Sequence, residues 1–124
     1  MSTKKKVLVV DDDHDTLDLI EVVLFSDYEI FTALNGFDGL NLAQQQIPDL
    51  IITDIMMPVM DGIRFINRLR KGPDTRSIPV IALTSFVEKN PVKSLLNMGF
   101  NDVVPKPFDK DDILKTVHAI IGGK

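Results

Sequence analysis

The hydrophobic residues of this chain gather in short runs that alternate with longer amphipathic segments. Five of the runs have the length of β-strands, and three of them are nearly all apolar and rich in Val, Ile or Leu. Such composition is typical of strands in a parallel sheet that helices cover on both faces. The predicted strands are Val7–Val10, Tyr28–Ala33, Leu50–Thr53, Val80–Thr84 and Asp102–Pro105.

The segments that follow these runs carry apolar residues three or four positions apart, which is the spacing of an amphipathic helix. Asp109 precedes the last segment and is a candidate N-cap. Turn-forming pairs such as Asn35–Gly36 and Asp61–Gly62 separate the segments. The apolar stripes are Leu17, Ile20, Val23 and Leu24; Leu40, Ala43 and Ile47; Ile63, Ile66 and Leu69; Val92, Leu95 and Leu96; and Ile113, Leu114, Val117, Ile120 and Ile121.

The order of these elements predicts an α/β fold of the (βα)₅ type. Crossovers of this length favour parallel strands with right-handed connections. A closed barrel requires about 250 residues, whereas this chain has 124. We therefore expect an open, doubly wound five-stranded sheet in one domain over residues 1–124, with its core at about 5–122 and no output domain.

The amino-acid composition excludes several classes of protein and site. Hydrophobic residues make up 44% of the chain and charged residues 26%, which is a globular balance. The absence of cysteine excludes disulfides, thiolate zinc sites and cysteine catalysis. A net charge of −4 and the lack of Trp argue against nucleic acid as a partner. Apolar runs are short and no signal peptide is evident, so we expect a cytoplasmic protein without membrane insertion.

Acidic residues stand where two of the predicted strands end. Asp11, Asp12 and Asp13 follow the first strand, and Asp54 follows the third. In a doubly wound sheet, ligands bind beyond the carboxyl ends of the strands. Carboxylates that meet at one edge repel each other unless a cation compensates them. Their hard oxygens suit Mg²⁺.

Two further groups complete this edge, because Thr84 and Ser85 end the fourth strand and Lys106 follows the fifth. A metal, an amine and a hydroxyl around Asp54 suit phosphoryl transfer, with Asp54 as the nucleophile that forms an aspartyl phosphate. Each residue also has a simpler interpretation, such as an N-cap for Asp13 or a solvated charge for Lys106. Their joint placement favours the site.

Other motifs for metal or phosphate chemistry fit less well. An EF-hand loop starting at Asp11 requires Gly where Thr16 stands and Glu where Val22 stands. A dehalogenase-type phosphatase requires Thr where Asp15 stands. The glycine-rich loops that bind nucleotides are absent from the sequence.

Four segments together resemble the response-regulator receiver domain, and the resemblance runs from about Lys5 to Gly122. They are Val7–Asp13, Asp54–Gly62, Ile81–Ser85 and Lys106–Phe108. The second is the most specific match. The resemblance implies a flavodoxin-like strand order of 2-1-3-4-5 and a stand-alone receiver, similar to chemotaxis regulators, in a two-component or phosphorelay pathway.

The resemblance also implies the site. Asp54 accepts a phosphoryl group from a histidine kinase or a histidine phosphotransfer protein. Asp11, Asp12 and Asp54 bind Mg²⁺ together with the backbone carbonyl of Met56, and Mn²⁺ is a substitute. Lys106 pairs with the phosphoryl oxygens, and Thr84 hydrogen-bonds to them.

The same resemblance implies the backbone geometry around the site and the way in which the domain signals. It implies that the Lys106–Pro107 bond is cis and that Pro58 and Gly62 shape the loop beside the site. Thr84, Ser85, Val103 and Pro107 belong to the switch and output region. The domain hydrolyses its own aspartyl phosphate without turning over external substrates. It docks a downstream effector or relays the phosphoryl group, as a monomer or weak dimer.

Several positions depart from the family pattern. Val103 replaces a usual aromatic, so an aromatic rotamer switch coupled to Thr84 cannot work in the usual way. Ser85 stands where Ala or Gly is common. Asn90 and Pro91 predict a fourth helix that starts late and runs short.

The apolar residues Met56 and Phe86 are each two positions beyond a site residue. Since neither can orient a water molecule, we expect slow self-hydrolysis. Two alternatives stay open at this point. One is a pseudo-receiver that works without phosphorylation, and the other is a small metal-dependent phosphatase with external substrates.

Overall fold

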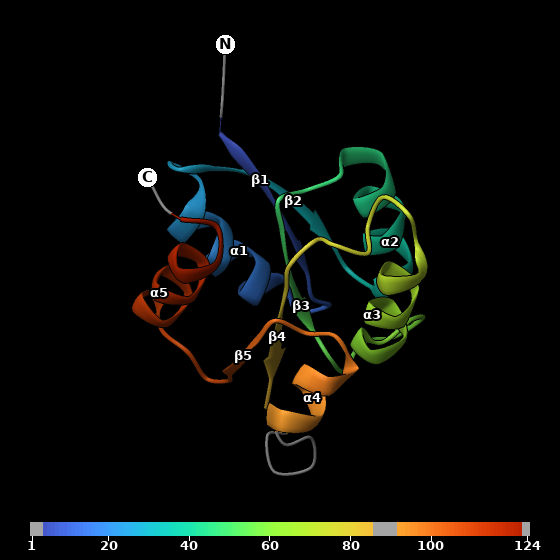
Figure 1. Ribbon diagram of the computed structural model, residues 1–124. Coiled ribbons are helices and arrows are strands. Elements are labelled where there is room, and N and C mark those ends of the chain that lie inside the picture. The colour runs from blue at the N-terminus through green and yellow to red at the C-terminus, as the bar shows by residue number, and fades with distance from the viewer. Residues whose placement is uncertain (1–3, 86–91, 123–124) are drawn as a thin grey trace.

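The computed structural model describes residues 4–85 and 92–122, within which five strands alternate with five helices (Figure 1). The strands β2, β4 and β5 have the predicted bounds, whereas β1 starts two residues earlier and β3 includes Asp54. The strands are β1 Lys5–Val10, β2 Tyr28–Ala33, β3 Leu50–Asp54, β4 Val80–Thr84 and β5 Asp102–Pro105. The helices are α1 His14–Leu24, α2 Gly36–Gln46, α3 Gly62–Lys71, α4 Val92–Met98 and α5 Lys110–Ile121.

All strand pairs are parallel, and the sheet order is β2-β1-β3-β4-β5, as predicted. Val10 at the end of β1 lies opposite Thr53 of β3. Thr84 at the end of β4 lies opposite Pro105 of β5. The carboxyl ends of these four strands therefore meet at one edge of the sheet.

Helices cover both faces of the sheet, with α1 and α5 on one side and α2 and α3 on the other (Figure 1). Side chains of successive strand residues alternate between the two faces. Val7 and Val9 accordingly join the core under α1 and α5, while Leu8 and Val10 join the core under α2 and α3. This double burial explains why the sequences of the three central strands β1, β3 and β4 are mostly apolar.

Polar side chains mark the helix starts. Asp109 caps α5 as predicted, and its carboxylate accepts from the backbone N–H of Asp112. Asp13 caps α1, which agrees with the simpler of its two interpretations. The predicted start of the fourth helix, at Asn90 and Pro91, lies outside the described residues.

Arg70 connects segments at the amino ends of β4 and β5, which lie at the end of the sheet opposite the acidic residues. Its guanidinium donates to the carbonyls of Gly99, Arg76 and Ile78 at 2.7–3.1 Å and to the side chain of Asn101 at 3.0 Å. Burial lowers the pKa of this guanidinium. Within the described part of the chain, no helix is long and apolar enough to cross a membrane.

Candidate functional site

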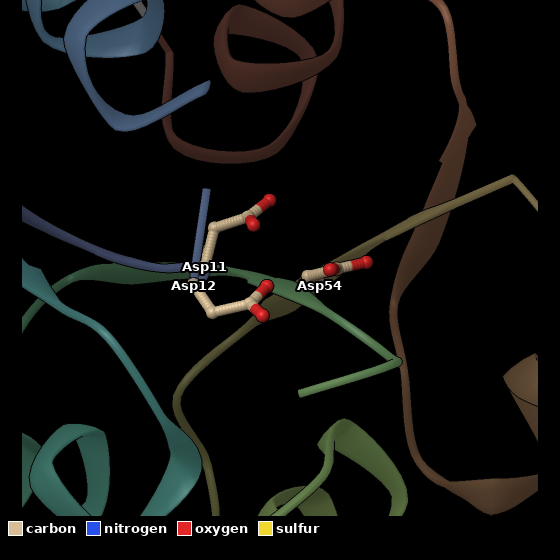
Figure 2. Close-up of side chains that lie close together, drawn as sticks. All are labelled: Asp11, Asp12 and Asp54. Atoms are coloured by element: carbon tan, nitrogen blue, oxygen red, sulfur yellow. The ribbon is translucent and has the colours of Figure 1, made fainter. Parts of the chain in front are cut away.

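Three carboxylates gather at the carboxyl ends of β1 and β3 (Figure 2). Asp11 and Asp12 directly follow β1, and Asp54 is the last residue of β3. Each side chain offers one oxygen that lies within 4.8 Å of the other two. Asp11 is fully buried and Asp54 is 8% exposed, whereas Asp12 is exposed. The predicted acidic cluster therefore forms, with one carboxylate open to solvent.

The spacing of the cluster suits a small divalent cation. Oxygen ligands of Mg²⁺ lie at 2.0–2.1 Å from the ion, so two ligands are at most about 4.2 Å apart. The separation of 4.8 Å or less therefore calls for only small side-chain adjustments. The exposed position of Asp12 leaves room for the water molecules that Mg²⁺ usually keeps. The donor set thus fits Mg²⁺.

Lys106 reaches the cluster from the segment after β5. Its ammonium lies 3.0 Å from Oδ2 of Asp11 and 3.5 Å from Oδ2 of Asp54. Two backbone features place this side chain. The Lys106 N–H donates to the carbonyl of Thr84 at 2.9 Å, and the Lys106–Pro107 peptide bond is cis, as predicted. Lys106 therefore compensates part of the negative charge.

Burial and neighbouring charges shift the pKa values of both Asp54 and Lys106. Burial raises the pKa of Asp54 and the negative charge of Asp11 raises it further, while Lys106 and the Ile55 N–H lower it only in part. Burial alone lowers the pKa of Lys106, but Asp11 and then Asp54 raise it above its ordinary value. The acids thus outweigh the lysine, and the cluster favours a further cation.

Backbone N–H groups orient two of the carboxylates, a feature that the sequence analysis missed. The Ile55 N–H donates to Oδ1 of Asp54 at 2.8 Å. The Asp13 N–H donates to Oδ1 of Asp11 at 2.9 Å. These bonds leave Oδ2 of each carboxylate directed to Lys106. No side-chain pattern in the sequence marks such donors, because every residue except proline carries one.

The loop from β3 to α3 returns to the end of β3 at Gly62, where the two backbone segments are in contact. The Gly62 N–H donates to the carbonyl of Ile55 at 2.8 Å. A Cβ atom at position 62 would lie 2.4 Å from the carbonyl oxygen of Asp54. Only glycine therefore permits this approach, in agreement with the loop-shaping role that we predict for Gly62. Pro58, the other predicted loop residue, is exposed.

Three of the four predicted switch and output residues line two clefts. Ser85 and Lys106 line a cavity of about 350 Å³ that Thr16, Leu19, Pro107 and Phe108 complete. Val103 and Pro107 line a second cavity, of about 270 Å³, between β5 and α5. Val103 is thus absent from the lining of the first cavity.

Thr84 and Met56, two further predicted site residues, differ in their exposure to solvent. Thr84 is buried at the end of β4. Met56 is 59% exposed, and it lies two residues beyond Asp54 in the loop after β3. Phe86, the other residue of the predicted slow hydrolysis, lies outside the described residues.

Comparison with known proteins yields one consistent family. The family model of the response regulator receiver domain matches residues 7–118. Protein PilH of Pseudomonas aeruginosa is 32% identical over 119 residues, which are 95% of this chain and 98% of PilH. Other curated relatives are longer, and the chain spans only 47% and 48% of two of them.

Solved structures agree with this family and with the acidic cluster. The chemotaxis response regulator CheY4 of Vibrio cholerae superimposes with a TM-score of 0.87 at 32% identity, over 95% of this chain and 99% of CheY4. The receiver domain of the sensor histidine kinase PA1611 from Pseudomonas aeruginosa gives 0.88 at 28% identity, over 97% and 99%. The latter structure has a magnesium ion coordinated in its active-site cleft.

Proposed function

Since this chain belongs to the response regulator receiver domain family of two-component signalling, we propose that it accepts a phosphoryl group on Asp54. The donor is a histidine kinase or a histidine phosphotransfer protein. Receiver domains bind Mg²⁺ at an acidic aspartate cluster, and Asp11, Asp12 and Asp54 form such a cluster here. We assign them as metal ligands, together with the backbone carbonyl of Met56. Mn²⁺ also suits these oxygen donors.

One observation supports this proposal more than any other. The carboxylates of Asp11, Asp12 and Asp54 come within 4.8 Å of one another, and the same group is contacted by Lys106. A structural role alone does not account for three neighbouring acids of which only two contact Lys106, because the mutual repulsion of the acids opposes folding. Phosphoryl transfer accounts for it, since that reaction depends on positioning and charge neutralisation.

The reaction assigns a separate task to each residue. A carboxylate oxygen of Asp54 attacks the phosphorus of a phosphohistidine, the P–O bond forms, and the P–N bond breaks with its electron pair leaving on the imidazole. The ion, when bound, withdraws electron density from the phosphoryl oxygens. The N–H of Ile55 holds the Asp54 carboxylate in one orientation. Lys106 then exchanges part of its ion pair with Asp11 for a phosphoryl oxygen.

Output follows from the charge that phosphorylation adds. Thr84 hydrogen-bonds the phosphoryl group, and Ser85, Val103 and Pro107 transmit the change to the surface around β5 and α5. Phosphorylation biases two arrangements of this surface, and a downstream effector docks on one of them, or the phosphoryl group is relayed. We also propose a cytoplasmic monomer or weak dimer that hydrolyses its own aspartyl phosphate.

The proposal is tested by incubating the protein with acetyl phosphate and Mg²⁺ and measuring its intact mass. We expect one phosphoryl group per chain, no phosphoryl group after chelation of the metal, and none in Asp54→Asn. Asp74→Asn is the matched control, since Asp74 is exposed and lies outside the acidic cluster. Phosphorylation of Asp54→Asn at the unaltered rate would contradict the proposal.

The pseudo-receiver alternative is not favoured. In a receiver that works without phosphorylation, Lys106 would still compensate the charge of Asp11, but its close approach to Asp54 would serve no reaction. In the phosphatase alternative, an external phosphoester would be turned over. Incubation with an external phosphoester distinguishes this alternative, because the inorganic phosphate released would then exceed one equivalent per chain.

A further inference from the structure

A cleft at the β2 edge of the sheet shares no lining residue with the acidic site. β2 is the edge strand, with α1 and α2 on its two sides (Figure 1). The cavity has about 350 Å³ and is bordered by α1, by the end of β2 and by Asp38 of α2. Its lining residues are His14, Leu17, Asp18, Glu21, Thr32, Ala33, Leu34 and Asp38.

Exposed apolar side chains occur on the same three segments that line this cleft. Leu34 lines it and is 40% exposed, and Phe37 in the first turn of α2 is 52% exposed. Val22 is 68% exposed, and it lies one helical turn beyond the lining residue Asp18. Residues four apart share one side of a helix. Single exposed apolar residues are ordinary, but a group around a cleft indicates a docking surface.

The charge of the lining selects the occupant. Asp18, Glu21 and Asp38 contribute three carboxylates, and the lining contains neither Lys nor Arg. A cationic side chain that enters the cleft therefore gains Coulomb energy, and its apolar neighbours can pack on Leu34 and Phe37. A free inorganic cation would leave these apolar side chains in water. The combination fits a basic, partly apolar protein segment.

We propose that this cleft, together with Val22, Leu34 and Phe37, binds a partner protein through a segment that carries Arg or Lys beside apolar side chains. Electrostatic attraction guides the approach of the segment, so salt weakens the binding. The surface acts independently of Asp54, because none of the acidic site's residues lines the cleft. Binding is therefore expected in the presence and absence of a phosphoryl group.

The test is an NMR titration of the ¹⁵N-labelled protein with a synthetic peptide in which Arg and Leu repeat at helical spacing. We expect saturable shifts at Asp18, Glu21, Leu34 and Asp38. The double variant Asp18→Lys/Glu21→Lys should weaken this binding by about tenfold or more. Asp27→Lys/Asp74→Lys changes the net charge equally at exposed positions outside the cleft, and it should retain the affinity within about twofold.

Three results would overturn this proposal. The first is equal weakening by both double variants, which would indicate unspecific charge attraction. The second is that the largest shifts fall at Asp11–Asp13. The third is that shifts at the cleft appear on raising the protein concentration alone, which would make a second copy the occupant. Phosphorylation by acetyl phosphate should be unchanged in Asp18→Lys/Glu21→Lys. This second measurement reports that the variant is folded, and it distinguishes a failure of the docking proposal from a failure of the proposed function.

Discussion

The ammonium of Lys106 lies 3.0 Å from Oδ2 of Asp11, although 95 positions separate the two residues in the sequence. Asp11 is fully buried, and Lys106 is its ion-pair partner. The same ammonium lies 3.5 Å from Asp54. Lys106 therefore links Asp11, which follows β1, to the proposed phosphorylation site on β3.

Removal of this ammonium should destabilise the metal-free protein. Lys106→Met leaves Asp11 buried without its ion pair, and we expect a loss of about 1–3 kcal/mol in the free energy of unfolding. Urea denaturation with and without Mg²⁺ measures the effect. The loss should be smaller in Mg²⁺, because the cation compensates the same acids. Lys93→Met, at an exposed position of α4, serves as the control. An equal, small loss in both variants would contradict the role of Lys106.

The raised pKa of Asp54 predicts a stability that depends on pH. Burial, with the charge of Asp11 added, makes the ionised form less favourable in the folded state than in the unfolded state. A group whose pKa is raised by folding binds more protons in the folded state, so stability falls as the pH rises through that range. Asp54→Asn removes this penalty.

We therefore expect Asp54→Asn to unfold at a higher temperature than the parent at pH 7 in metal-free buffer. Each kcal/mol gained should raise Tm by about 4 °C in a chain of this length. The gain should vanish below the ordinary pKa of 3.8, where Asp54 is protonated in both states. Thermal unfolding followed by circular dichroism across the pH range is the measurement. A gain that persists unchanged at low pH would exclude a charge effect.

Gly62 should tolerate no side chain. A Cβ atom there would lie 2.4 Å from the Asp54 carbonyl oxygen and 2.8 Å from Cα of Ile55, both of them backbone atoms. We expect Gly62→Ala to lose about 1–3 kcal/mol in the free energy of unfolding and to slow phosphorylation by acetyl phosphate, since the loop shifts away from Asp54. Chemical denaturation and the mass assay test both effects. Unaltered stability would show that the loop adapts freely.

Met56 should prolong the lifetime of the aspartyl phosphate. It is exposed beside Asp54 and has no group that orients an attacking water molecule. We expect Met56→Asn to lose its phosphoryl group faster than the parent, by about tenfold, in a time course of intact mass after removal of the donor. Met98→Asn, at another exposed methionine, is the control. The hypothesis fails if the parent dephosphorylates as fast as Met56→Asn or faster.

Much of the architecture follows from local sequence patterns. The alternation of apolar runs and amphipathic segments predicts the α/β fold and the bounds of β2, β4 and β5. The signal is strongest in β4, whose residues are all buried and must therefore be mostly apolar. The gathering of Asp11, Asp12 and Asp54 follows from parallel strands that end at one edge. Asp54 is the last residue of β3 and does not lie in the loop after it, because it still pairs with Leu83 of β4.

Other contacts could not be predicted, because they depend on where backbone groups lie. The Ile55 N–H that orients Asp54 leaves no mark in the side-chain sequence. The same holds for the three carbonyls that Arg70 contacts, two in the loop after α3 and one, of Gly99, 29 positions beyond Arg70 in the chain. Arginine in the last turn of α3 resembles an ordinary solvated charge until these carbonyls are brought to it.

The central claim is that Asp54, among the three gathered acids, receives the phosphoryl group. The direct measurement is reduction of the phosphorylated protein with borohydride, which converts an acyl phosphate into an alcohol, followed by peptide mass mapping. The account predicts this modification at position 54 alone and only after incubation with Mg²⁺ and the donor. Modification at Asp11 or Asp12, or an unmodified residue 54 in protein that carries a phosphoryl group, would contradict it.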